Sequence, residues 1–237
     1  MTGFSRLARP TLLGIGALAA SLAFAVLAAL VASGELDAVD RFAVDHLMPN
    51  RSAYHSRISL LASALSYRGH NFHAGGVIRL PASLLLSTLL IAMTSAYLWR
   101  RGRSREATMW ATVFVAALLV EELCKLTITR PALFRDFRGE PVHLTGFDSS
   151  FPSGHAVRAL VLAAAVASIW RRLGPLLAVW LVAVALTLSV DGIHTPSDIV
   201  GGFLLAAALV AIGKLLHGRQ VESSKIRPTH RSVFDEC

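Results

Sequence analysis

Six apolar blocks dominate this chain and limit what it can fold into. Five of the six are close to the roughly 20 residues that an α-helix needs to cross the ~30 Å hydrocarbon core of a bilayer, at about 1.5 Å per residue. Only 16% of the sequence is charged, whereas soluble domains average about 25%. The sequence therefore predicts an all-α, polytopic membrane protein with six transmembrane helices. The blocks cover approximately residues 11–33, 77–99, 107–128, 153–170, 176–190 and 199–216.

The blocks form one predicted domain with short ends. We expect residues 1–10 to be a cytoplasmic N-terminus, 11–217 a single transmembrane domain with its core at about 55–215, and 218–237 a basic, disordered cytoplasmic tail. The first block could instead belong to a cleaved signal peptide, but the apolar core of such a peptide has only about 7–15 residues. A retained helix is therefore the preferred interpretation of this block.

Positive charge is concentrated in short runs between the apolar blocks. The net charge of +8 could indicate nucleic-acid binding, but this distribution indicates membrane topology and contact with anionic headgroups. Lys and Arg favour cytoplasmic loops. This preference places four segments in the cytoplasm: the N-terminus, the run Arg100–Arg105, the pair Arg171–Arg172 and the tail. We expect the lipid bilayer to be the partner of this chain, and we expect no binding of nucleic acid. We expect a protein of the bacterial cytoplasmic (inner) membrane, with its site facing the periplasm or the cell exterior.

The segment between the first two blocks is mixed in character. Its apolar stretch Ile58–Leu65 is short and flanked by arginines, which fits an interfacial or re-entrant helix. His70 and His73 could form a metal pair, but no third ligand stands nearby in the sequence, so a solvated loop is the preferred interpretation. No metal site and no cofactor are therefore expected.

Three polar islands interrupt the apolar sequence at helix ends that share the predicted outer face. The first is Lys125 with Arg130-Pro131, the second is Pro152–His155, and the third is His194 with Asp198. Ionisable groups at membrane depth are costly and usually functional. The three islands together are therefore better explained by a site than by packing.

The first two islands suit the binding of a phosphate. Lys125 and Arg130 can neutralise its oxygens, together with the Ser153 hydroxyl and the backbone N–H groups that open a helix at Gly154. A phosphate ester needs this neutralisation before a nucleophile can approach. The islands thus predict an anion site at the outer end of the bundle.

The third island supplies the groups for phosphoryl transfer. A neutral imidazole such as His194 can attack phosphorus and form a phospho-enzyme. Asp198 stands four residues later and can fold back toward that ring if Pro196 lies in the first turn of a helix. His155 can then protonate the leaving oxygen as a general acid. Two histidines and one aspartate would make a phosphomonoesterase that needs no metal.

In order and spacing these residues resemble the motifs of the type 2 phosphatidic acid phosphatase superfamily, which includes vanadium haloperoxidases and glucose-6-phosphatase. The Pro-Ser-Gly-His motif is intact at Pro152–His155. The third motif of the family is Ser-Arg, five residues, His, three residues and then Asp. Its His-x-x-x-Asp half is intact at His194 and Asp198, and Gly201-Gly202 follows it. The resemblance implies the six-helix membrane architecture of the lipid phosphatase branch. It also implies that His194 is the nucleophile, Asp198 its partner and His155 the general acid.

The chain departs from this family in two motifs. In the first motif, Arg-Pro should follow Lys125 after six residues, but Ala132-Leu133 stands there and Arg130-Pro131 comes two residues early. In the third motif, the expected Ser-Arg is replaced by Thr187 and Leu188. Loss of a guanidinium that contacts a transition-state oxygen can cost on the order of a hundredfold in rate.

Three further charged residues lie inside the apolar blocks. Arg158 follows His155 by three residues and so lies on roughly the same helix face. It could replace the cation missing at Leu188, or it could be a snorkelling arginine. Glu121 and Glu122 are either ion-pair partners or helix-end residues.

The leading hypothesis is an integral membrane phosphatase of the phosphatidic acid phosphatase type, a metal-independent phosphoric monoester hydrolase. It would act on a lipid phosphomonoester or diphosphate at the outer leaflet through a phospho-histidine. Candidate substrates are phosphatidic acid, phosphatidylglycerol phosphate, a polyprenyl diphosphate and a lipid A phosphate. One alternative is a lipid phosphotransferase with a hydroxyl acceptor, and another is a degenerate, non-catalytic relative.

Overall fold

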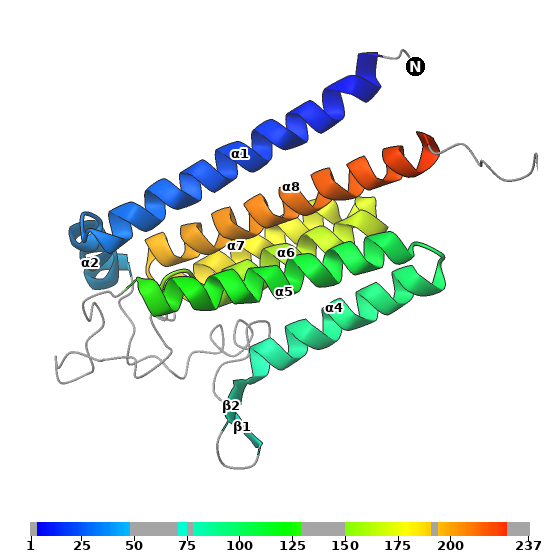
Figure 1. Cartoon of the computed structure of the whole chain (residues 1–237). Helices are drawn as coiled ribbons and strands as arrows, with labels where there is room; N and C mark the ends of the chain where they lie inside the picture. Colours follow the sequence, from blue (N-terminus) through cyan, green and yellow to red (C-terminus); the bar gives the residue numbers. More distant parts are fainter. Residues whose placement is uncertain (1–3, 48–70, 75–77, 129–149, 191–193, 227–237) are drawn as a thin grey trace, which may run out of the picture.

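The computed structural model describes residues 4–47, 71–74, 78–128, 150–190 and 194–226 (Figure 1). Within these residues the chain is helical, apart from one short antiparallel hairpin formed by two strands. In chain order the elements are α1 (Phe4–Ala32), α2 (Asp37–Leu47), β1 (Asn71–Ala74), β2 (Ile78–Pro81), α4 (Ala82–Arg100), α5 (Ser104–Thr127), α6 (Gly154–Ile169), η1 (Arg171–Leu173), α7 (Gly174–Val190) and α8 (Pro196–Ile226).

The six predicted transmembrane blocks correspond to α1, α4, α5, α6, α7 and α8. Helices α1, α4, α5 and α8, and α7 together with η1, contain segments long and apolar enough to cross a membrane. Helix α6 has 16 residues, of which eight are buried, and it reaches only about 24 Å. The prediction of an all-α, polytopic membrane protein is therefore confirmed, and the β1–β2 hairpin is a small addition to it.

One prediction differs from the structure, and others fall on residues that the structure does not describe. Helix α8 continues to Ile226, whereas the sequence predicts a disordered tail from residue 218. No proline interrupts it before Pro228, and helices usually end at or before the residue that precedes a proline. The predicted Ile58–Leu65 helix and His70 lie outside the described residues.

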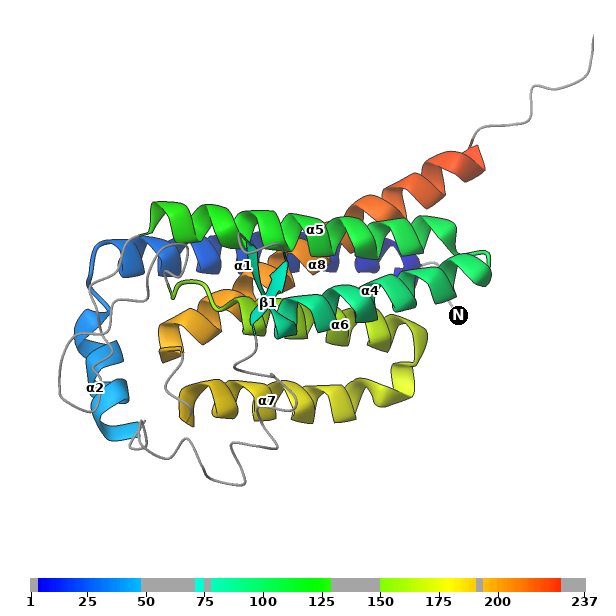
Figure 2. The same cartoon turned by 90° about the horizontal axis from the view of Figure 1, so that it is seen from below.

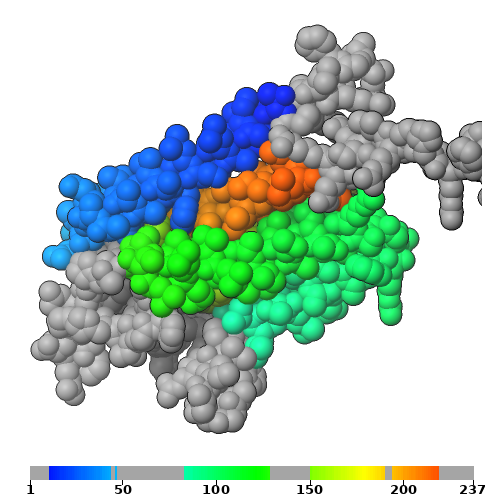
Figure 3. All heavy atoms as spheres, in the orientation of Figure 1, coloured from blue at the N-terminus to red at the C-terminus, as the bar shows by residue number. Residues whose placement is uncertain are grey.

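Helix α6 lies inside the bundle, in contact with α4, α5, α7 and α8 (Figures 1 and 2). Helix α1 packs along α8, and on the face seen in Figure 3 the helices α1, α8, α5 and α4 lie side by side. The main core is built around the buried Trp110, whose Nε1 donates a hydrogen bond to Ser168 Oγ at 3.2 Å. Large apolar side chains such as Leu18, Leu119 and Val179 stay exposed, as expected where helices face lipid.

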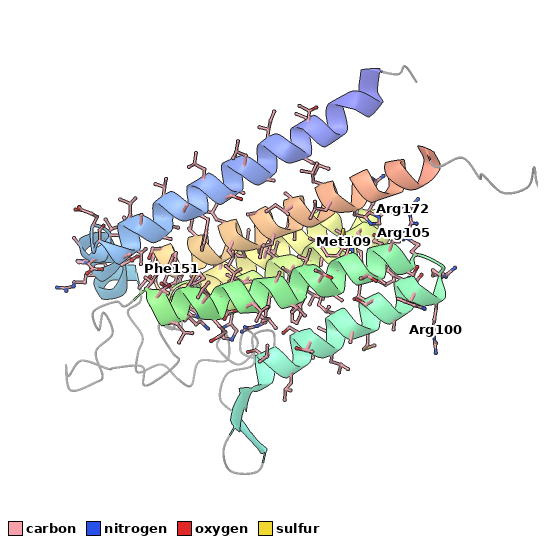
Figure 4. All side chains as sticks on the ribbon, in the orientation of Figure 1. Arg100, Arg105, Met109, Phe151 and Arg172 are labelled. Atoms are coloured by element: carbon pink, nitrogen blue, oxygen red, sulfur yellow. The ribbon has the colours of Figure 1, made fainter. Side chains whose placement is uncertain are left out.

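The helices alternate in direction, so the basic runs and the polar islands gather at opposite ends of the bundle. Figure 4 places Arg100, Arg105 and Arg172 at one end, and Phe151, which precedes the start of α6, at the other. The start of α1 lies at the arginine end, whereas α2 lies across the opposite end (Figures 1 and 2). The charge pattern predicts this separation. That the arginine end faces the cytoplasm stays a prediction.

Two glycines let α8 approach the start of α6 closely. A Cβ at Gly202 would lie 2.6 Å from the carbonyl oxygen of Ser153 and 2.9 Å from Ala156 Cβ, and one at Gly201 would lie 2.4 Å from Phe151 Cε2. Backbone atoms in a packed interior cannot move aside as the end of a flexible side chain can. Gly202 therefore fixes the distance at which α8 crosses α6, and with it the separation of two of the polar islands.

We expect Gly202→Ala to lower the free energy of unfolding by about 1–3 kcal/mol, because the added methyl forces the two helix starts apart. Thermal unfolding of the protein in detergent measures this. The matched control is Gly218→Ala on the same helix, where nothing lies within 4 Å of the added Cβ. The control should be as stable as the wild type or slightly more so, because alanine favours the helix. A Gly202→Ala protein as stable as this control would contradict the close crossing.

Candidate active site

The Pro-Ser-Gly-His stretch forms the start of α6. Ser153 is the N-cap, and its Oγ accepts a hydrogen bond from the backbone N–H of Ala156 at 3.4 Å. The Ser153 N–H donates to the carbonyl oxygen of Asp198 at 2.9 Å, which ties the start of α6 to the first turn of α8. Ser153 and Gly154 are both buried. The structure thus gives the Ser153 hydroxyl a capping contact, and a phosphate contact for it stays a prediction.

Helix α8 begins with Pro196 in its first turn, as the sequence predicts. Thr195 N–H donates to Asp198 Oδ2 at 3.0 Å, and Asp198 N–H donates to Thr195 Oγ1 at 3.4 Å, so the two residues cap the helix reciprocally. Ser150 Oγ donates to the other carboxylate oxygen, Asp198 Oδ1, at 3.3 Å. Asp198 is fully buried, and these donors hold its carboxylate in one orientation.

The three residues predicted to be catalytic lie together at this end of the bundle. The ring centroids of His155 and His194 are 5.9 Å apart in an edge-to-face arrangement. His194 Nδ1 lies 3.7 Å from Asp198 Oδ2, within reach of an ion pair but beyond hydrogen-bond length. Nδ1 is buried and has no hydrogen-bond partner among the described residues. Such bonds are often long in ligand-free enzymes and shorten when substrate binds.

A second polar cluster joins α5 to α6. The Glu121 carboxylate, 1% exposed, accepts hydrogen bonds from Lys125 Nζ at 2.6 Å and from Arg158 Nη1 at 3.3 Å. Lys125 Nζ also lies 3.3 Å from Glu122 Oε1. Both described candidates for phosphate-binding cations are therefore held by one buried acid. Of the interpretations left open for Glu121, the ion-pair partner is the one observed.

The position at which the third family motif carries arginine is packed with apolar side chains. Leu188 is fully buried, in a cluster with apolar residues of α6, α7 and α8. The site therefore has no cation from this position. Arg130 falls in residues 129–149, outside the described part of the chain, and its phosphate-binding role stays a prediction.

A pocket opens between α4, α6 and α7 beside the polar groups. His155 and Arg158 line it together with apolar side chains that include Leu86, Leu162 and Trp180. An apolar pocket with a few convergent polar groups is typical of ligand sites. This one is small and mainly apolar, and it brings His155 and Arg158 to the same opening.

Asp40 of α2 supports the site and was missed in the sequence. It is 1% exposed and accepts hydrogen bonds from Ser197 Oγ at 2.5 Å and from the Ser197 N–H at 3.3 Å. Ser197 Oγ in turn lies 3.1 Å from Thr195 Oγ1. Asp40 and Ser197 are 157 positions apart, so no local pattern links them. Asp40 fastens α2 to the turn that carries His194 and Asp198.

We expect Asp40→Ala to lower the free energy of unfolding by about 1–3 kcal/mol, because it leaves the buried donors of Ser197 without their acceptor. Thermal unfolding in detergent measures the loss. The control is Glu35→Ala, which removes an exposed acid just before α2. Equal stability of the two variants would show that the contact between α2 and α8 contributes nothing measurable.

Comparison with known proteins adds a family and a fold. The PAP2 superfamily model matches residues 106–222, which include every described candidate residue. Among solved structures, the chain is similar to "the first transmembrane PAP2 type phosphatidylglycerolphosphate phosphatase from Bacillus subtilis", with a TM-score of 0.61 and 20% sequence identity. The similarity covers 90% of this chain and 98% of that one, and at this identity it shows the fold. No curated protein matches this chain.

Proposed function

We propose that this chain, whose residues 106–222 match the PAP2 superfamily model, is a membrane phosphatase that removes a phosphoryl group from a lipid. The observation that carries the proposal is the pair of imidazoles, 5.9 Å apart, at one end of a bundle of membrane helices. A buried carboxylate stands beside one of them, and an apolar pocket reaches the other. A lipid phosphate combines the charge and the apolar chains that this arrangement suits.

His194 is the proposed nucleophile. With its Nδ1 turned toward Asp198 at 3.7 Å, a proton on Nδ1 leaves the lone pair of Nε2 to attack phosphorus. As the N–P bond forms, the bond from phosphorus to the lipid oxygen breaks, and His155 donates a proton to that oxygen. Asp198 stabilises the positive charge that develops on the phosphorylated ring.

The second half of the reaction restores the enzyme. Water attacks the phospho-histidine and passes a proton to His155, which now acts as general base. The N–P bond breaks, and His194 returns to its neutral form as inorganic phosphate leaves. His194, Asp198, His155 and one water balance both steps, so this route requires no metal.

Lys125, Arg158 and the N–H groups that open α6 are the proposed phosphate-binding groups. Lys125 and Arg158 lie near each other through their shared contact with Glu121. Arg130 would add a further guanidinium, as the sequence predicts. The cations neutralise the phosphate oxygens while the transferring group carries its highest charge.

The proposed substrate is a lipid phosphomonoester or diphosphate in the outer leaflet of the bacterial cytoplasmic membrane. The similar Bacillus subtilis protein is named a phosphatidylglycerolphosphate phosphatase, so phosphatidylglycerol phosphate is the first candidate. Phosphatidic acid, a polyprenyl diphosphate and a lipid A phosphate follow. The gathering of Arg100, Arg105 and Arg172 at the opposite end supports this orientation (Figure 4).

A phosphate-release screen over these four lipids tests the proposal. We expect purified protein in detergent to release inorganic phosphate from at least one of them, equally well with and without a chelator. Rapid quenching with a lipid labelled in the phosphoryl group should trap an acid-labile phospho-protein. Absence of both release and phospho-protein across the panel would overturn the proposed function.

A lipid phosphotransferase is the second candidate, and the packed leucine at position 188 favours it. Without the motif arginine the phosphate-binding groups hold the substrate less tightly, and the phosphoryl group on His194 could pass to a lipid or sugar hydroxyl. Incubation without any acceptor separates the two reactions. A hydrolase releases free phosphate in that mixture, whereas a transferase yields product only when a hydroxyl acceptor is added.

A further inference from the structure

Glu121 is buried where an acid is hardest to accommodate. It lies on the membrane helix α5 with 1% of its surface exposed, whereas the side chain of its neighbour Glu122 is 51% exposed. A buried carboxylate in a membrane helix is costly unless cations and donors surround it. The contacts of Glu121 should therefore explain why it is there.

Two cations from two helices meet at the Glu121 carboxylate. Lys125 Nζ, one turn later on α5, lies 2.6 Å from Oε1. Arg158 Nη1, on α6, lies 3.4 Å from Oε1 and 3.3 Å from Oε2, so it is shared by both oxygens. Both are cations that we propose to bind the phosphate. Glu121 thus determines where each of them lies relative to the other.

Gly154 makes room for this acid at the start of α6. A Cβ on Gly154 would lie 1.9 Å from Glu121 Oε1 and 2.7 Å from Arg158 Nη1. The carboxylate and the guanidinium therefore lie against the first residue of α6, at the helix end that carries positive partial charge. His155, the proposed general acid, is the next residue. The cluster is thus adjacent to the reacting groups.

We propose that Glu121 is a positioning residue that holds Arg158 and Lys125 at the phosphate site, an inference that rests on the proposed function. Arginine has many rotamers, and its donors are useful only when the planar guanidinium is fixed in orientation. Leu188 leaves the third motif without its arginine, so the site depends on Arg158, and the orientation of Arg158 depends on Glu121.

The donors of the cluster leave capacity for a phosphate. Glu122 also contacts Lys125, so the two acids balance the two cations in formal charge, and the capacity lies in the N–H groups that the acids leave unused. Among the described residues, Glu121 contacts only Nη1 of Arg158, so the other guanidinium N–H groups can donate to phosphate oxygens. Glu121 therefore orients Arg158 without using all of its donors.

The test compares Glu121→Gln with Glu122→Gln. Each variant removes one negative charge, the two positions are adjacent, and both acids contact Lys125. Of the two, only Glu121 contacts Arg158. We expect Glu121→Gln to lower kcat/KM for the lipid phosphate by about tenfold or more, with the larger share in KM. Glu122→Gln should stay within about threefold of the wild type. Thermal unfolding of each variant separates loss of fold from loss of activity.

A double-mutant cycle then asks whether Glu121 acts through Arg158. Residues that act as one unit show non-additive effects. We expect Glu121→Gln to cost about tenfold in the wild type but no more than about threefold when Arg158 is already alanine. A purely structural role for Glu121 would give the same cost in both backgrounds, and that result would overturn the inference.

Two further outcomes keep this inference separate from the proposed function. If Glu121→Gln retains a kcat/KM within threefold of Glu122→Gln, Glu121 does not position Arg158 and Lys125. The proposed phosphatase function is not affected by that result. If the wild type gives neither phosphate release nor phospho-protein with any lipid, the proposed function fails, and the rise in unfolding temperature on adding inorganic phosphate decides the inference. A rise in the wild type and Glu122→Gln that is lost in Glu121→Gln would support it. An equal rise in Glu121→Gln, or none in the wild type, would overturn it.

Discussion

Replacing His194 with alanine is expected to lower phosphate release by at least about a thousandfold, because the substitution removes the atom that bonds to phosphorus. The Asp198 carboxylate and the phosphate-binding cations Lys125 and Arg158 remain, so the variant should still bind the lipid phosphate. The effect should therefore fall on kcat and leave KM nearly unchanged. Phospho-protein should also be absent from quenched reactions.

His217→Ala is the matched control for this variant. It removes an imidazole from α8 more than twenty residues further along the chain, and α8 runs away from the polar islands toward the arginine end of the bundle (Figure 1). It should keep the phosphate-release rate of the wild type. Activity that survives His194→Ala, with unfolding temperatures equal in the two proteins, would rule out His194 as nucleophile.

Arg158→Ala is expected to lower kcat/KM by about a hundredfold, the cost of removing one donor from a developing oxyanion. Arg158 lines the same pocket as His155 and is the described arginine that can replace the one absent at Leu188. Lys125→Ala should show a loss of similar size. Steady-state kinetics with the best lipid phosphate measures both variants.

Arg158→Lys and an added guanidinium salt make this prediction specific. Lysine keeps the charge but lacks the planar fork of donors, so Arg158→Lys should recover only part of the loss. Millimolar guanidinium should partly restore Arg158→Ala and should not affect the control Arg172→Ala at the other end of the bundle (Figure 4). Full activity in Arg158→Ala beside an inactive Lys125→Ala would show that Arg158 does not replace the missing arginine.

The helical architecture could be predicted from local sequence alone. Blocks of about twenty apolar residues can satisfy their backbone hydrogen bonds in a membrane only as helices or closed barrels, and each block became a helix. The end of α8 was less predictable, because its last turns depend on the absence of a proline before Pro228 more than on hydropathy. Length and composition also identify α6 as a transmembrane helix less clearly than they do its neighbours. It has only 16 residues, and half of them are buried among the other helices.

The candidate catalytic groups could be predicted because each belongs to a short motif. Pro152–His155 places a helix start and an imidazole together. The spacing of His194, Pro196 and Asp198 places a carboxylate one turn after a second imidazole. Capping chemistry then makes these segments fold as expected, and the reciprocal bonds of Thr195 and Asp198 are of this local kind.

The sequence by itself determined the membrane helices, the motif residues and the separation of basic runs from polar islands, because local hydropathy, spacing and charge encode all of these. Only the tertiary structure decided which groups meet across helices. Asp40 reaches Ser197 from 157 positions away, and Glu121 of α5 meets Arg158 of α6 over Gly154. Such pairs depend on how closely the helices cross, and that distance is set by the packing of many residues together.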